Sequence, residues 1–216
     1  MEAPHSDRSR IAALCGFAAI ALALVTTLAG GAARPGYSHV SQYISELGET
    51  GAVHGALVSA LGFAPTGIAM LLFLALAAPS LPRARGTALG LACFAGAGVA
   101  YVVSALARCD AGCPSSGAIS TRQAIHNAFG VYEYLGAFVG LLLLGAAFRR
   151  SKRWQKSARA CFFCAGLVGA GFAAMLMPSL APVRGAAQRV AELGVFLWIG
   201  IVGVALLRRP AGGTPV

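Results

Sequence analysis

The sequence contains few charged residues and very few acidic ones. Of its 216 residues only 11% are Asp, Glu, Lys or Arg, only seven are acidic, and 8% are aromatic. A soluble globular domain carries roughly 25% charged residues. The chain is instead 57% apolar, with a mean hydropathy of +0.73. These proportions exclude an ordinary water-soluble fold and predict an integral membrane protein.

Familiar catalytic motifs are also absent. The sequence has no G-x-S-x-G nucleophile elbow, no H-E-x-x-H, no P-loop and no G-x-G-x-x-G dinucleotide fingerprint. These absences leave the corresponding soluble hydrolase, zinc protease and nucleotide-binding chemistries without support. These motifs assign no metal ligands, and they leave the cofactor and the metal content unknown.

Six apolar segments are long enough to cross a membrane as helices. A span needs about 18 residues or more, because each residue adds about 1.5 Å and the hydrocarbon core is about 30 Å thick. The segments are 11–32, 53–78, 87–107, 125–148, 157–177 and 190–207. Alternating segments of about ten residues, typical of outer-membrane strands, are missing. We therefore predict an all-α polytopic bundle of six transmembrane helices, forming one membrane domain over 1–216 with a flexible tail at about 208–216.

The formal net charge of +10 is distributed unevenly over this arrangement. The side that holds both termini carries 12 of the 17 basic residues: Arg8, Arg10, Arg83, Arg85, Arg149, Arg150, Lys152, Arg153, Lys156, Arg159, Arg208 and Arg209. On the other side five arginines are balanced by five acids, which are Arg34, Arg108, Arg122, Arg184, Arg189, Glu46, Glu49, Asp110, Glu133 and Glu192. Basic loops remain in the cytoplasm, so we expect both termini inside a prokaryotic cytoplasmic membrane. The charge indicates topology and attraction to the lipid bilayer, not nucleic-acid binding.

A secretory signal peptide is the alternative for the first span. Arg8 and Arg10 precede the apolar run, as in such peptides. The run of about 20 residues exceeds the usual 7 to 15, however, so we expect a retained span. Cleavage would leave five spans and an external N-terminus.

A short helix is predicted at about 38–47, on the outer side of the membrane. Ser38 is a suitable N-cap, and Gly48 a suitable residue to end the helix. Its polar positions are candidate ligand-binding residues, namely His39, Gln42 and Glu46. Such a helix can lie in the interface with a solvated polar face, or fold over the bundle as a lid with its polar groups in a cavity.

Glu133 is the most informative residue of the fourth span. It lies roughly 12 Å along the helix from Ile125, where a charge is unfavourable by about 2.5 to 3.5 kcal/mol. His126 shares its helix face, and the positions between and beyond them on that face are small. A carboxylate at this depth usually faces the bundle interior and has a partner. The pattern predicts either a polar cleft or a structural pair that joins two helices.

The other outer connections supply further candidates for ligand binding. His54 and His126 occupy equivalent positions in Ala-Val-His and Ala-Ile-His, each at the start of a returning helix. Arg189 and Glu192 lie three residues apart at the start of the sixth span, so they can pair with each other or with Glu133. We favour a structural ion pair between Arg189 and Glu192.

The six cysteines differ in their predicted surroundings. Cys109 and Cys113 lie in an outer loop, where an oxidising compartment favours a disulfide that would fix Asp110 in place. Zinc binding by these two cysteines and His126 is a weaker alternative. The C-x-x-C formed by Cys161 and Cys164 lies within an apolar helix, and we expect no redox role for it.

Several of these features together resemble a known family. The stretch Tyr37–Gly48, read as Y-S-H-V-S-Q-Y-I-S-E-L-G, occurs with Cys109-Asp110, His126 and Gln188-Arg189. This set resembles the bacterial and archaeal multi-pass membrane family catalogued as domain of unknown function 998, over almost the whole chain. The resemblance implies a six-helix membrane protein and leaves its activity open. Members often have Phe-Pro before the Asp of the middle loop, whereas this chain has Ala107-Arg108-Cys109.

Three functions are compatible with the sequence. The first is binding or movement of a lipid or small polar ligand in an outward-facing polar cavity. The second is a membrane-embedded, hydrolase-like enzyme acting on a lipid or isoprenoid, with His126 as acid or base. Its other candidate catalytic residues are Asp110, Glu133, Ser41 and Ser45. The third is a structural or assembly role without a small ligand; the oligomeric state is left open.

Overall fold

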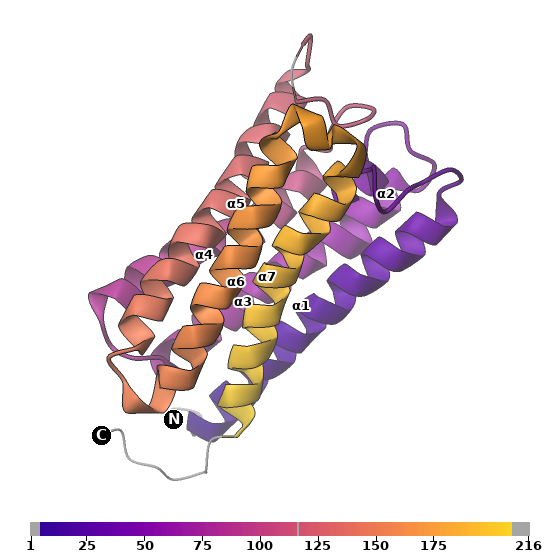
Figure 1. The fold of residues 1–216 in the computed structure, drawn as a ribbon. Helices are drawn as coiled ribbons and strands as arrows, with labels where there is room; N and C mark the ends of the chain where they lie inside the picture. Colours follow the sequence, from indigo (N-terminus) through magenta and orange to yellow (C-terminus); the bar gives the residue numbers. More distant parts are fainter. Residues whose placement is uncertain (1–4, 116, 209–216) are drawn as a thin grey trace.

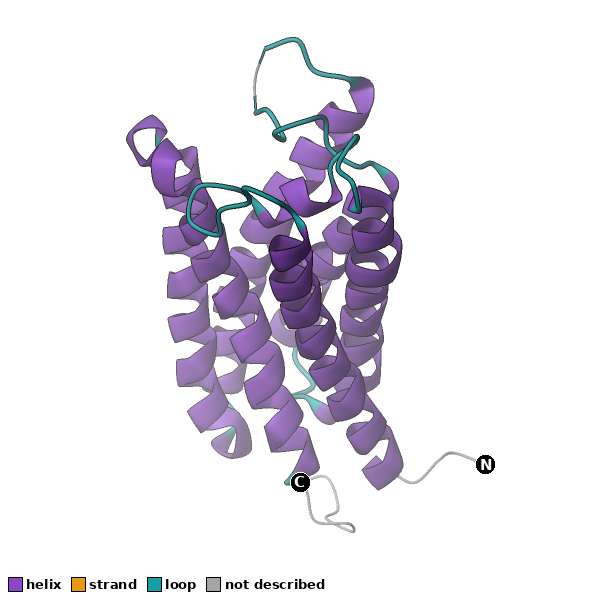
Figure 2. Ribbon diagram, turned by 90° about the vertical axis from the view of Figure 1, so that its right-hand side faces the viewer, coloured by secondary structure: helices purple, strands orange, loops and turns teal. Residues whose placement is uncertain are grey.

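The computed structural model describes residues 5–115 and 117–208. Within these residues the chain consists of helices and connecting loops, without a strand (Figure 2). The long helices run side by side along one common direction. The predicted flexible tail, apart from Arg208, lies outside the described residues.

The helix bounds follow the predicted spans closely. The α-helices are α1 (His5–Ala33), α2 (Gly55–Leu57), α3 (Ala64–Ala77), α4 (Arg85–Leu106), α5 (Thr121–Phe148), α6 (Gln155–Leu176) and α7 (Arg184–Leu207). A π-helix, η2 (Val58–Phe63), joins α2 to α3, and short 3₁₀ helices are η1 (Ile44–Gly48), η3 (Ala78–Ser80), η4 (Lys152–Trp154) and η5 (Pro178–Val183). Six helical stretches are long and apolar enough to cross a membrane, which confirms the predicted six-span helical fold.

The chain reverses direction between successive spans, so α1 begins and α7 ends at the same end of the bundle (Figure 1). This end carries the basic connections around 83–85 and 149–159 and is called the basic end. The opposite end consists of the segments 34–54, 107–120 and 177–183 and is called the loop end. Two helices extend further toward the loop end than their hydropathy suggests, since the spans predicted from 125 and 190 begin at Thr121 and Arg184.

The spans form a closed ring, in which each packs against its neighbours in chain order and α1 also packs against α7. The middle of the ring is filled by aromatic side chains. Trp198 is 1% exposed, and its ring lies 4.4 Å from that of Phe94 and 6.0 Å from that of Phe73. The indole of Trp198 donates a hydrogen bond to the sulfur of Cys161 at 3.2 Å. Trp198 is thus a core residue rather than an interfacial anchor.

Small residues allow the helix backbones to touch. A Cβ atom added to Gly140 of α5 would lie 2.7 Å from the carbonyl oxygen of Gly90 of α4. Such a contact is too short for any side chain, so a larger residue would force the helices apart. Between lipid-immersed helices, where the hydrophobic effect contributes little, this close packing supplies much of the association.

The π-helix explains how the second span accommodates Pro65. Proline has no N–H to donate and its ring clashes with the preceding turn, which predicts a distortion here. The structure places the π-helix Val58–Phe63 directly before it. Widening the turn in this way accommodates a proline within a membrane helix.

Candidate functional site

The segment 37–49, called the cap segment below, covers part of the loop end. Its helix is shorter than predicted, because only Ile44–Gly48 is helical and 39–42 form turns. The reason is local hydrogen bonding. The side chain of Gln42 accepts from the Ser38 N–H at 2.8 Å, and the carboxylate of Glu46 accepts from the Tyr43 N–H at 2.9 Å. The Glu46 carboxylate thus takes the Tyr43 N–H that a helix begun at Ser38 would bond to the His39 carbonyl oxygen, although the Gln42 N–H still donates to the Ser38 carbonyl oxygen at 2.9 Å.

Three arginines from outside the cap segment bind it through ion pairs and hydrogen bonds. Arg34 forms an ion pair with Glu49 at 2.6 Å, and Arg184 forms one with Glu46 at 3.0 Å. Arg108 donates to the carbonyl oxygens of Gly48 and Glu49 at 2.7 and 2.6 Å. Glu46, only 2% exposed, is thus part of the structure of this cap. Sequence reasoning singled out Glu46 but missed Arg34, Arg108, Arg184 and Glu49, because their partners are distant along the chain.

Arg189 also binds the cap segment. Its guanidinium donates to the Tyr37 hydroxyl and to Nδ1 of His39, both at 2.8 Å, and to the carbonyl oxygen of Gln42 at 3.2 Å. A fourth bond goes to the Gly185 carbonyl at 2.9 Å. Partial burial and the Arg189 charge lower the pKa of His39, and burial raises the pKa of Tyr37. Neutral His39 therefore accepts a hydrogen bond from Arg189.

The predicted ion pair between Arg189 and Glu192 is wrong. Arg189 points to the cap segment, whereas Glu192 points into the bundle. There the Glu192 carboxylate accepts hydrogen bonds from the hydroxyls of Tyr101 at 3.0 Å and Tyr134 at 2.9 Å. A spacing of three residues places two side chains on neighbouring parts of a helix surface, but neutral donors from α4 and α5 satisfy Glu192 instead.

A hydrogen-bonded chain connects Glu192 to the cap segment. The side-chain amide of Gln188 donates to the Tyr134 hydroxyl at 3.0 Å and accepts from the Ile44 N–H at 2.6 Å. Tyr134 in turn donates to Glu192. The position of the cap is thereby tied to the surroundings of a buried acid.

Glu133 lies beside Glu192 in the interior. A cavity of about 30 Å³ lies between α4, α5, α7 and the cap, lined by Ile44, Ser45, Phe63, Tyr101, Ser104, Glu133, Gln188 and Glu192. Glu133 is 7% exposed, and within the described residues its Oε1 has no hydrogen-bond partner. The predicted interior position of Glu133 is therefore present, with Glu192 rather than His126 as its neighbour.

His126 is buried in different surroundings, about two helical turns nearer the loop end. Its Nδ1 hydrogen-bonds the carbonyl oxygen of Ala107 at 3.0 Å. Asp110 accepts from the N–H and the hydroxyl of Ser120 at 3.0 and 2.7 Å, and these bonds lower the pKa of Asp110. Among the described residues no hydrogen bond joins His126 to Asp110 or Glu133. An acid–base pair with His126 at its centre stays a prediction without a supporting contact.

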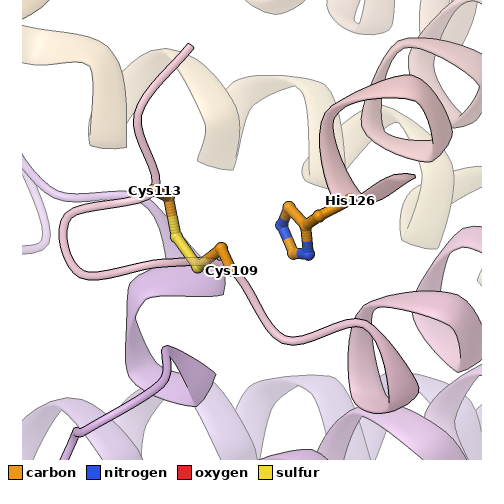
Figure 3. A group of neighbouring side chains, drawn as sticks. All are labelled: Cys109, Cys113 and His126. Carbon is orange, nitrogen blue, oxygen red and sulfur yellow. A yellow bond between two sulfur atoms is a disulfide. The ribbon is translucent and has the colours of Figure 1, made fainter. Parts of the chain in front are cut away.

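The two cysteines of the loop end form the expected disulfide, Cys109–Cys113, with His126 close by (Figure 3). The ligand atoms of these three residues lie within 4.8 Å of one another, so the reduced form has the donors for a metal ion. Thiolates are the ligands in such sites, and a disulfide removes them. In the oxidised protein, Cys109 and Cys113 therefore form a covalent cross-link within the loop 107–120.

The remaining candidate residues either form hydrogen bonds within the loop end or are exposed. The Ser45 hydroxyl donates to the sulfur of Cys113 at 3.4 Å, and the carbonyl oxygen of Ser41 accepts from Arg184 at 3.2 Å. The side-chain amide of Gln42 donates to Glu46 at 2.9 Å. His54 is exposed and precedes α2. No bond among the described residues places either serine next to His126.

A large cavity lies on the side of the bundle, between α1 and α7. These helices approach each other at the basic end and diverge toward the loop end (Figure 1). The groove between them has a volume of about 1050 Å³. Its walls are mainly apolar, and include Phe17, Ile20, Leu24, Leu28, Leu193, Phe196, Leu197 and Val204. Several of these, such as Leu24 and Leu193, are more than half exposed, so the groove is open to the membrane interior.

The two ends of the groove differ in charge. At the loop end lie His39 and Arg189. Arg189 donates hydrogen bonds to His39 and to the carbonyl oxygen of Gly185. At the basic end lie Arg153, Lys156 and Arg208, all exposed. No hydrogen bond or ion pair within the described part of the chain engages these three cations. Along α7 the groove extends from Arg189 to Arg208, roughly 28 Å at about 1.5 Å per residue.

Fold and site together define a polytopic helical membrane protein with a cap segment over its loop end and a lateral groove between α1 and α7. Residues 17–205 match the family model described as protein of unknown function DUF998. This match covers most of the chain, so the protein belongs to that family. No curated protein and no solved structure matches this chain.

Proposed function

We propose that this protein binds an anionic lipid in the groove between α1 and α7. The headgroup lies at Arg153, Lys156 and Arg208, and the chain extends along the apolar walls toward Tyr101 and the cap segment. The supporting observation is that three cations, which have no side-chain partner among the described residues, converge at one end of a membrane-facing apolar groove. A phosphate-bearing headgroup is complementary to such a cluster.

The length of the groove favours a long lipid chain. One leaflet contributes about 15 Å of hydrocarbon, half of a core of about 30 Å. A groove of roughly 28 Å is nearly as long as both leaflets together. A long acyl or isoprenoid chain fits this length, in agreement with the lipid or isoprenoid ligand expected from the sequence.

We also propose that the basic end faces the cytoplasm of a prokaryotic cell. The positive-inside rule supports this orientation, because the basic residues concentrate at the end where α1 begins and α7 ends. The headgroup would then belong to the inner leaflet, and the cap segment would lie outside. A tag at Lys152 should be inaccessible from outside intact cells; labelling from outside would overturn the orientation.

The groove itself is tested by filling it. Gly200 of α7 lines the groove, and a Cβ added there meets only Ile20 Cδ1, at 3.5 Å. Gly200→Leu therefore places a side chain in the groove without a severe clash. The control is Gly166→Leu on α6, where a Cβ meets nothing within 4 Å and the site is exposed outside the groove.

Native mass spectrometry of the detergent-purified protein, titrated with phosphatidylglycerol or phosphatidylcholine, measures the outcome. We expect the wild type and Gly166→Leu to retain phosphatidylglycerol preferentially, and Gly200→Leu to lose at least tenfold in its affinity. Equal retention by all three proteins would overturn the proposal. A chemically cross-linked dimer with Gly200 at the contact would also overturn it, by showing that a second copy covers the groove.

A further inference from the structure

Glu133 and Glu192 are two buried acids that form no ion pair within the described part of the chain. Each is only 7% exposed, and the ion pairs of the described residues involve Glu46 and Glu49 instead. Both residues line the same small cavity, so their carboxyl groups are neighbours. Two carboxylates in contact repel strongly where little water screens them.

The nearest positive side chain does not balance both acids. Arg189 is close enough to attract Glu192, but its own hydrogen bonds go to Tyr37, His39 and two carbonyl oxygens. One guanidinium offsets one carboxylate, so one negative charge remains. An unbalanced charge inside a membrane protein is costly. Neutrality at this site needs one additional positive charge.

The cavity beside the two acids has room for a small ion. Its volume of about 30 Å³ exceeds the roughly 10 to 15 Å³ that one water molecule requires. Glu133 Oε1 has no partner among the described residues, although the side chain is more than nine-tenths buried. Ser45, Ser104 and Tyr101, whose side chains each carry an oxygen atom, are among the residues that line the cavity. Oxygen ligands of this kind suit a hard cation.

We propose that this cavity binds one small monovalent cation, a proton or a sodium ion, held by Glu133 with Glu192 beside it. Glu133 is the primary ligand, because the oxygens of Glu192 already accept hydrogen bonds from Tyr101 and Tyr134. A single positive charge makes the two acids and Arg189 neutral together, whereas a divalent ion would leave an excess.

The other side chains around Glu133 and Glu192 come from α4, α5, α7, the cap segment and the π-helix. Tyr101 comes from α4, Tyr134 from α5 and Arg189 from α7. The cap segment and the π-helix contribute the uncharged residues Ile44, Ser45 and Phe63. Glu133 is therefore the carboxyl group whose replacement should remove the cation. This site does not depend on the lipid proposal, although Glu192 and Tyr101 line both cavities.

The test uses the full chain in detergent, without added lipid. Thermal unfolding is recorded for the wild type at increasing NaCl, with KCl keeping the ionic strength constant, and separately from about pH 5 to about pH 9. The variants are Glu133→Gln, which keeps the shape but not the charge, and Ser104→Ala, which removes one neutral oxygen. Infrared difference spectra on acidification report the carbonyl stretch of a protonated carboxylic acid.

A sodium site predicts that each tenfold rise in NaCl above the dissociation constant stabilises the wild type by about 1.4 kcal/mol, the equivalent of a tenfold mass-action change. Ser104→Ala should need more sodium for the same shift, and Glu133→Gln should not respond. A proton site predicts no sodium effect, a protonated-acid band in the wild type, and loss of that band in Glu133→Gln. If the wild type shows neither the sodium effect nor the protonated-acid band, the proposal is overturned, whatever lipid the protein retains.

Discussion

Arg184 at the start of α7 reaches Glu46 in the cap segment, with its Nη2 atom 3.0 Å from Oε1. The two residues are 138 positions apart in the chain. Arg184 also lies over the ring of Tyr43, its Cζ atom 4.6 Å from the ring centroid. Through this contact the last helix fixes the position of a segment that follows the first helix.

Glu46→Gln should destabilise the protein by about 2 to 3 kcal/mol, because Arg184 loses its charged partner and the bond from Tyr43 becomes weaker. Thermal unfolding in detergent should show a decrease of several degrees. Asp7→Asn removes an exposed carboxylate at the basic end and serves as the control, with no expected change. An unchanged melting temperature for Glu46→Gln would show that the cap contributes little to stability.

The Cys109–Cys113 disulfide closes a ring of five residues, which the loop-entropy relation associates with about 2 kcal/mol. The double variant Cys109→Ala/Cys113→Ala should unfold at a lower temperature than the oxidised wild type. A reductant should lower the wild type to the same level and leave the double variant unchanged. If the reductant lowered both proteins equally, a different disulfide would be responsible.

The sequence predicts the parts of this molecule that depend on local composition. Apolar runs specify the six spans, since burial of a backbone in lipid requires helices. The isolated charge at Glu133 likewise predicts an interior position, because lipid does not tolerate it. The pair Cys109 and Cys113 needs only proximity along the chain to suggest a disulfide.

The partners of these residues were less accessible to prediction. Glu192 meets Tyr101 and Tyr134, which come from two other helices, and no local pattern encodes that meeting. The spacing of Arg189 and Glu192 indicated an ion pair, but the hydrogen bonds of Arg189 go to the cap segment and to Gly185. The groove depends on the angle between α1 and α7, which follows from packing over the whole bundle.

The pKa of His39 is lowered by partial burial and by Arg189, so its protonation opposes folding. Below about pH 6.5 the unfolded chain takes up this proton more readily than the folded one, and stability therefore falls as the pH decreases. His39→Asn offers an amide oxygen to Arg189 that does not titrate. The difference in melting temperature between variant and wild type should widen from about pH 8 to about pH 5; a constant difference would contradict this prediction.

The three cations at the basic end of the groove should act together on lipid affinity. Each Lys or Arg near an anionic surface contributes about 1 kcal/mol, which is roughly a fivefold effect on binding. Arg153→Gln/Lys156→Gln/Arg208→Gln should therefore reduce phosphatidylglycerol affinity by about a hundredfold, and raised salt should narrow the difference. The control Arg83→Gln/Arg85→Gln/Lys152→Gln removes as much charge at the same end from exposed residues outside the groove. Native mass spectrometry should show only a small loss of phosphatidylglycerol affinity for the control, because its cations do not converge on one headgroup. Equal losses of affinity in both triple variants would mean that net charge alone attracts the lipid.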